Sequence, residues 1–107
     1  MNLARRIAQA EMETAWRAFE AIVLGAIPAP WRSRAREAAR RTRSGLPSPA
    51  ALLAAVQACP EEYQRAVLAV VEELQRGPPP PPASPAENLA RIGDWLRRAA
   101  EPVGALP

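Results

Sequence analysis

The chain lacks most of the residues that carry catalysis at neutral pH. It contains no histidine and no lysine, and among its 107 residues it has a single cysteine, a single tyrosine and a single aspartate. General acid–base and nucleophilic catalysis need groups that titrate or attack near neutral pH, so this inventory argues against an enzyme. With Cys59 as the one cysteine, the chain has neither the pair for an internal disulfide nor the ligands for a zinc site. We expect a non-enzymatic protein without metal or cofactor, in which Cys59 is a small buried residue.

Large apolar residues and long apolar runs are also scarce. Leu, Ile, Val and Phe together make 21 residues, whereas Ala alone makes 24. A core built on methyl groups is thin, although Ala favours helices and lets them approach closely. We therefore expect a homo-oligomer or a subunit of a complex, in which the long first helix offers an apolar stripe to its partner.

No segment has the pattern of a membrane span or a signal peptide. The uncharged run over residues 21–31 is well short of the ~20 apolar residues that cross a bilayer. Three glutamates, Glu11, Glu13 and Glu20, interrupt the stretch that precedes it. We expect a soluble, cytoplasmic protein.

The spacing of apolar residues predicts an all-α fold, a small bundle of four or five helices with a polyproline segment before the last helix. The predicted helices cover residues 3–25, 30–43, 48–58, 60–76 and 84–101. Residues at spacings of three and four form the apolar stripe of the first helix: Ala8, Met12, Ala15, Trp16, Phe19, Ile22, Val23 and Ala26. The inward residues predicted for the third and fourth helices are Leu52, Leu53, Val56, Tyr63, Ala66, Val67, Val70 and Leu74.

Residues that favour helix ends mark the limits of these segments. Asn2 is placed to cap the first helix and Ser48 the third. Ser84 and Glu87 have the spacing of a capping box before the last helix, and Pro102 is expected to end that helix.

Five consecutive prolines, residues 78–82, separate the last helix from the others. Such a run prefers polyproline II, a stiff rod of about 3 Å per residue. We interpret residues 77–83 as a rigid linker between a helical bundle domain, 1–76, and a C-terminal helix, 84–101, that packs on the bundle. Residues 102–107 are expected to form a flexible tail. A ligand for an aromatic-groove domain is the alternative interpretation of the prolines.

The basic charge of the chain is concentrated in one segment. Residues 31–43 carry six arginines and one glutamate, a net charge of +5, while the other residues carry eight arginines against ten acids, a net charge of −2. These six arginines are the predicted site for nucleic acid or a partner: Arg32, Arg34, Arg36, Arg40, Arg41 and Arg43. Four of them share one helix face, namely Arg32, Arg36, Arg40 and Arg43. Because Arg matches phosphate geometry well, we expect a small accessory protein that binds the nucleic-acid backbone without sequence specificity.

Two other interpretations of the basic helix remain open. The arginines form a solvated face, or they pair with the acidic residues of the helix over residues 60–76. The alternative function is that of an adaptor or regulatory subunit. Its basic helix and the acidic hairpin formed by the helices over residues 48–58 and 60–76 would dock an acidic protein partner or another copy of the chain.

Overall fold

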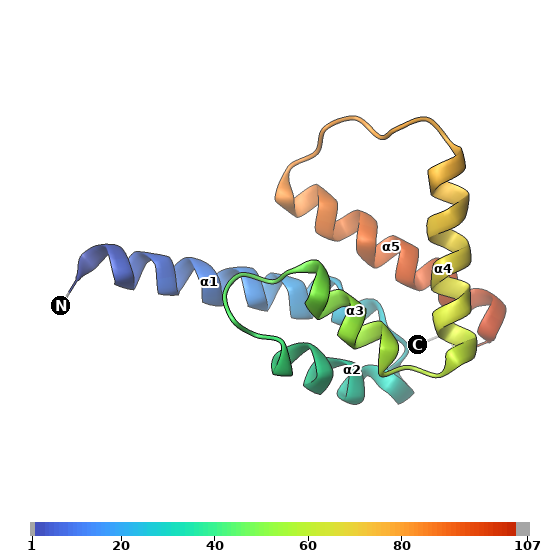
Figure 1. Cartoon of the computed structure of the whole chain (residues 1–107), viewed down its shortest axis with the longest axis horizontal. Helices are drawn as coiled ribbons and strands as arrows, with labels where there is room; N and C mark the ends of the chain where they lie inside the picture. The colour runs from blue at the N-terminus through green and yellow to red at the C-terminus, as the bar shows by residue number, and fades with distance from the viewer. Residues whose placement is uncertain (1, 105–107) are drawn as a thin grey trace.

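The computed structural model describes residues 2–104, and these are all helical or connecting segments without strands. The elements are α1 (Leu3–Ile22), a short 3-10 helix η1 (Leu24–Ala26), α2 (Ala29–Arg41), α3 (Pro49–Gln57), α4 (Glu61–Arg76) and α5 (Pro85–Val103). The prediction of an all-α bundle with five helices is confirmed. The proline segment before α5 forms an arch between the ends of α4 and α5 (Figure 1).

Both predicted caps at the helix starts of α1 and α5 are present. The backbone N–H of Ala4 donates to Asn2 Oδ1 at 3.0 Å, and the N–H of Glu87 donates to Ser84 Oγ at 3.2 Å. Ser48 occupies the N-cap position of α3, but its side chain makes no capping hydrogen bond. The cap prediction therefore holds for α1 and α5 and is wrong for the side chain of Ser48.

The prediction that Pro102 ends the last helix is wrong. Pro102 lies inside α5, which continues to Val103 and ends at Gly104, a residue in the left-handed region with φ of 72°. The N–H of Gly104 donates to the carbonyl oxygens of Ala100 and Glu101. A proline in the last turn keeps a helical φ and removes only one N–H donor, so the left-handed glycine ends the helix. Of the predicted tail, residues 102 and 103 belong to α5, and residues 105–107 lie outside the described part of the chain.

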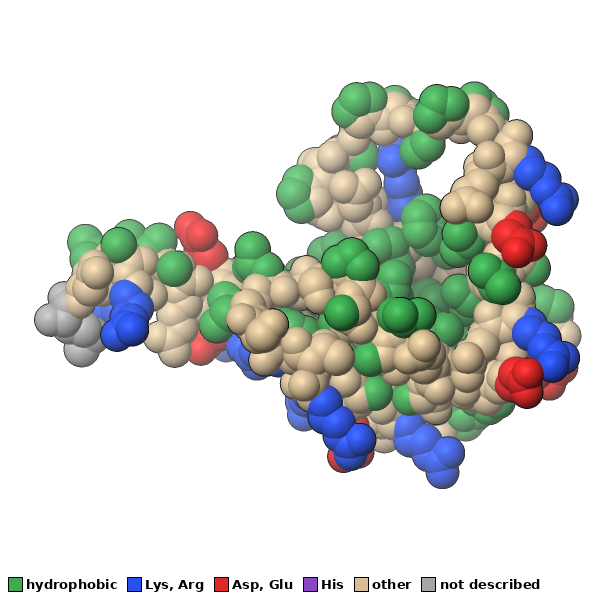
Figure 2. Space-filling model, viewed as in Figure 1, with side chains coloured by type: hydrophobic (Ala, Val, Ile, Leu, Met, Phe, Trp, Pro, Cys, Tyr) green, Lys and Arg blue, Asp and Glu red, His purple; other side chains and the backbone are tan. Residues whose placement is uncertain are grey.

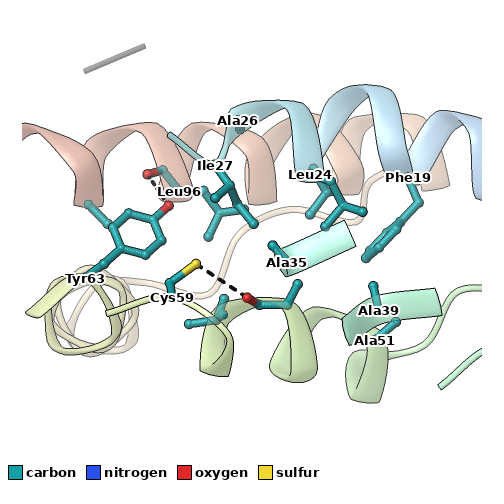
Figure 3. Packing of buried hydrophobic residues seen from close by; sticks show 14 of the residues in the cluster. Phe19, Leu24, Ala26, Ile27, Ala35, Ala39, Ala51, Cys59, Tyr63 and Leu96 are labelled. Carbon is teal, nitrogen blue, oxygen red and sulfur yellow. Dashed lines mark hydrogen bonds between the residues drawn. The ribbon is translucent and has the colours of Figure 1, made fainter. Parts of the chain in front are cut away.

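The core depends on small side chains, as the composition predicts. Seven of the buried apolar residues that the structure describes are alanines: Ala26, Ala35, Ala39, Ala51, Ala55, Ala99 and Ala100. Leu24, Ile27, Tyr63 and Leu96 are the large residues that they surround (Figure 3). The hydroxyl of Tyr63 on α4 donates to the carbonyl oxygen of Leu96 on α5 at 2.9 Å, which ties these two helices together inside the core.

Two of the residues predicted to face inward are on the surface. Leu53 is 58% exposed and Leu74 is 39% exposed. Ala51 and Ala55, on either side of Leu53 in the same helix, are fully buried instead. Ala51 lies beside Ala39 of α2 (Figure 3). Small residues allow a close approach of α2 and α3, so the close side of α3 is lined by methyl groups and Leu53 is left outside.

The first helix extends past the other helices of the bundle (Figure 1). Its second half contributes Trp16 and Phe19 to the core, and Val23 follows directly after the helix, whereas Ala8 on the same predicted stripe is exposed. The first turns of α1 extend beyond the other helices (Figure 1). The radius of gyration is 14.8 Å with a longest extent of 51 Å, compared with about 13 Å expected for a compact domain of this length. The stripe predicted for a partner is thus largely used by the chain itself.

None of the helices in the described residues is both long enough and apolar enough to cross a membrane.

Candidate functional site

The basic helix α2 lies at one edge of the molecule, where arginine side chains gather (Figure 2). Its opposite side is held in the core by Ala35 and Ala39, which are fully buried. Pro28 precedes the helix and Pro30 lies in its first turn, so the chain enters α2 with backbone angles that suit a helix start. The buried alanines anchor one side of the helix to the core, and the arginines lie on its other sides.

Arg32 is used within the fold. Its Nε donates to the carbonyl oxygen of Ile27 and its Nη2 to that of Gly25, both at 3.1 Å. These carbonyls lie at the end of η1, where helical hydrogen bonds stop and acceptors remain open. The guanidinium therefore joins the start of α2 to the turn before it, and only part of its surface is left for a ligand.

Two further arginines of α2, and Arg43 just after its end, have partners at the surface. Arg40 Nε lies 3.1 Å from Glu20 Oε1, and Arg41 Nη2 lies 2.8 Å from Glu37 Oε1. The guanidinium of Arg43 lies 5.4 Å from the ring centroid of Trp16, within the range of a cation–π contact. Glu20 and Trp16 both belong to α1. The face that was predicted to follow a phosphate backbone is thus directed partly toward α1.

The two remaining arginines have opposite surroundings. Arg34 is exposed, while Arg36 is half-buried and its Nε is enclosed without a hydrogen-bond partner. Within residues 2–104, none of the six arginines pairs with an acid of α4. The α4 acids are found near other arginines, with Glu61 at 2.8 Å from Arg65 and Glu73 at 3.5 Å from Arg98. The basic helix packs on α3, and among the described residues its arginines pair with Glu20 of α1 and Glu37 of α2, not with the acids of α4.

A second surface is an apolar groove of about 1010 Å³ with α1 as its floor. Its walls are the segment that leads into α3, over residues 46–52, and the start of α5, over residues 85–92. The residues of α1 that line the groove are Ile7, Ala10, Glu11, Thr14, Ala15, Ala18, Phe19 and Ile22. Hydrophobic side chains cover the projecting part of α1 and the surface between α3 and α5 (Figure 2). The groove is an open apolar surface that crosses three helices.

Sequence reasoning missed this groove because α1 has two apolar faces. The predicted stripe, centred on Trp16 and Phe19, enters the core. A second stripe runs along Leu3, Ile7, Ala10, Thr14 and Ala18 at spacings of four, three, four and four. Most of its side chains are small, so its amphipathic signal is weak in a chain so rich in alanine. The spacing itself was the signal that could have found it.

Cys59 has the surroundings of a structural residue. It is 5% exposed, and its thiol donates to the carbonyl oxygen of Ala55 at 3.4 Å (Figure 3). Burial raises the pKa of Cys59 to about 11, so the nucleophilic thiolate is scarce at neutral pH. Burial, and then the nearby Cys59, also raise the pKa of Tyr63 above its ordinary value. Neither group is prepared for nucleophilic or acid–base work near neutral pH.

Comparison of the chain with protein-family models gives no match, and neither does comparison with curated proteins or with solved structures. The geometry of the basic helix and of the apolar groove therefore carries the functional inference. In the described residues, no three His, Cys, Asp or Glu side chains lie close enough together to hold a metal ion.

Proposed function

We propose that the protein is a non-enzymatic interaction subunit whose docking surface is the apolar groove on α1. The observation that carries this proposal is the groove itself, which is lined by three helices and contains few polar side chains. An apolar groove open to solvent between several helices is a candidate surface for another protein. The poor inventory of catalytic residues and the raised pKa of Cys59 support a binding role over chemistry.

The dimensions of the groove suit a helix. Its floor extends from Ile7 to Ile22, which is about 22 Å at the rise of an α-helix. A helix laid on α1 between the two walls would complete a bundle in which α1 has neighbours on all sides. Recognition of this kind uses an amphipathic helix with anchors at spacings of three and four residues.

A photo-crosslinking residue in the groove tests this proposal. We would place benzoylphenylalanine at Leu89, which lines the groove and is half-buried, and as a matched control at Leu68, an exposed apolar residue of α4 outside the groove. Irradiation in the cells that make the protein is expected to yield a discrete protein adduct from position 89 and none from position 68. The absence of any adduct from position 89, or equal adducts from both positions, contradicts the proposal.

Nucleic-acid binding by α2 is the second candidate, and the exposure of Arg34, Arg40 and Arg41 favours it. Surface ion pairs such as those of Arg40 and Arg41 contribute little stability, so phosphate can replace their carboxylate partners at low cost. The double substitution Arg34→Gln and Arg41→Gln removes two exposed charges and leaves the core untouched. If duplex DNA is a ligand, the log-log salt slope should fall by roughly 0.9 for each phosphate that the variant no longer neutralises. An unchanged slope, or no binding by the unmodified chain at low salt, removes this candidate.

A further inference from the structure

We infer that the groove of each molecule holds the projecting first half of α1 from a second copy, so that two chains form an antiparallel dimer with a two-fold axis near the middle of α1. This inference rests on the proposed function, because it names the helix that the groove receives. It also gives a structural reason for the length of α1, whose first turns extend past the other described helices (Figure 1).

The first argument is the self-complementary pattern of the groove floor. In an antiparallel pair of identical helices, the numbers of two residues that lie opposite each other add up to the same value at every position. With a sum of 25, Ile7 faces Ala18, Ala10 faces Ala15, and Glu11 faces Thr14 of the second copy. These six positions, all of which line the groove, form a set that maps onto itself. A two-fold dimer requires such self-complementarity, because the same patch is used by both subunits.

The second argument is the exposed apolar surface at the end of α1. Leu3 is 68% exposed and Ile7 is 51% exposed. In the same register Leu3 lies opposite Ile22, which lines the buried end of the groove. The arrangement removes the apolar end of each helix from water and fills the groove of the other molecule at the same time. An unrelated helix in the groove would leave Leu3 exposed.

The third argument is the charge distribution of α1, which favours the antiparallel direction. The first half of α1 carries Arg5, Arg6 and Glu11, a net charge of +1, and the second half carries Glu13, Arg17 and Glu20, a net charge of −1, with Glu20 already paired with Arg40 of its own chain. No acid lies in the first turn and no base in the last turn, so the side-chain charges do not compensate the helix dipole. An antiparallel neighbour places the basic end of one helix beside the acidic end of the other. A parallel neighbour would bring Arg5 and Arg6 of the two copies together.

Small residues at the central positions allow the two helices to approach closely. Ala10, Thr14 and Ala15 lie near the middle of the proposed contact together with Glu11, and Ala18 lies farther from the axis, opposite Ile7. Thr14 Oγ1 already donates to the carbonyl oxygen of Ala10 at 2.9 Å, and its lone pairs remain available as acceptors. Packing of side-chain rows at spacings of three and four gives interhelical distances of about 8–10 Å. The leucines of the two walls, Leu52 and Leu89, would then cover the sides of the second helix.

Cross-linking between two differently tagged chains tests the register. We would replace Cys59 by Ala to remove the native thiol, place Ile7→Cys on one chain and Ala18→Cys on the other, and treat the mixture with a short bismaleimide. We expect a covalent dimer from the mixture. Each variant alone should give none, because in this register Ile7 lies about 11 positions, or about 16 Å, along the helix from Ile7 of the second copy. Circular dichroism of the Cys59→Ala chain establishes that the background is folded.

Each outcome decides the inference. A covalent dimer from Ile7→Cys alone indicates a parallel pair and overturns it, and so does the absence of a product from the mixture. Photo-crosslinking at Leu89 separates this failure from a failure of the proposed function. An adduct with residues 3–10 of a second copy supports both the proposed function and the dimer. An adduct with another protein supports the function and overturns the self-association. No adduct overturns both.

Discussion

The basic face of α2 and the apolar groove on α1 are both exposed surfaces, but they differ in how far the chain itself uses their side chains. On α2, Arg32 donates to backbone carbonyls and Arg40 pairs with an acid, and just after the helix Arg43 lies over an aromatic ring. In the groove, the apolar side chain of Ile7 is about half exposed on a surface open to solvent. A charged side chain is stabilised by a single partner or by water, whereas an apolar surface is stabilised only when another apolar surface removes it from water.

The largest expected effect concerns the helix crossing that forms one end of the groove. Gly93 of α5 lies against α1, and a Cβ atom there would be 2.9 Å from the carbonyl oxygen of Ile22. Gly93→Ala should therefore lower the free energy of unfolding by about 1–3 kcal/mol, although alanine is the better helix former. Urea denaturation followed by circular dichroism measures this change.

Gly45→Ala is the matched control, because a Cβ at Gly45 would meet nothing within 4 Å. Its expected effect is within about 0.5 kcal/mol. Equal stabilities for the two alanine variants would show that α1 and α5 do not cross as closely as the structure indicates, and the groove would then be without one of its walls.

A smaller effect should follow when the hydrogen bonds of Arg32 are removed. Arg32→Gln eliminates two charge-assisted hydrogen bonds to the end of η1 and should destabilise the fold by about 1–2 kcal/mol. The exposed Arg34, in the same helix, is the control, and Arg34→Gln should change stability by less than about 0.5 kcal/mol. If both variants unfold at the same urea concentration, Arg32 belongs with the solvated arginines and its full charge is available to a ligand.

The smallest effect is expected for the ion pairs of α2 at the surface. Arg40→Gln and Arg41→Gln break the pairs with Glu20 and Glu37. Both arginines and Glu37 are largely solvated, whereas Glu20 is partly buried, so each variant should cost less than about 1 kcal/mol, with Arg40→Gln the larger of the two. Thermal unfolding of the unmodified chain should likewise change little when salt is added. A large destabilisation in either variant would mean that these ion pairs stabilise the bundle as Arg32 does, and that the basic face is not free for a ligand.

The sequence predicts the helices well because their signals are local. Asn2, Ser84 and the run of prolines act within a few residues of their own position, and the structure has helices and connections where they indicate them. Pro102 misleads because the helix end depends on Gly104, whose left-handed conformation outweighs a proline in the last turn. The end of a helix depends on competition between neighbouring residues, and at the end of α5 Gly104 outweighs Pro102.

The site is predicted less well because it depends on which helix faces come together. The spacing of Arg32, Arg40 and Arg43 predicts that they share one face, but it does not reveal that Glu20 and Trp16 of α1 lie beside Arg40 and Arg43. The groove depends on a second apolar stripe of small residues and on walls from two distant segments. Pairings between distant segments leave no local trace in a single sequence.

The mass of the protein in solution, measured by sedimentation equilibrium across the micromolar range, tests most directly whether the groove or the basic face is the interaction surface. One chain has a mass of 11.6 kDa. We predict that the unmodified protein and the double variant Arg34→Gln/Arg41→Gln sediment as dimers, while Ile7→Glu, which places a charge on an already exposed position of α1, sediments as a monomer with unchanged helix content. A monomeric unmodified protein, or an Ile7→Glu variant that associates as tightly as the unmodified chain, would contradict the assignment of the groove as the surface that joins two copies.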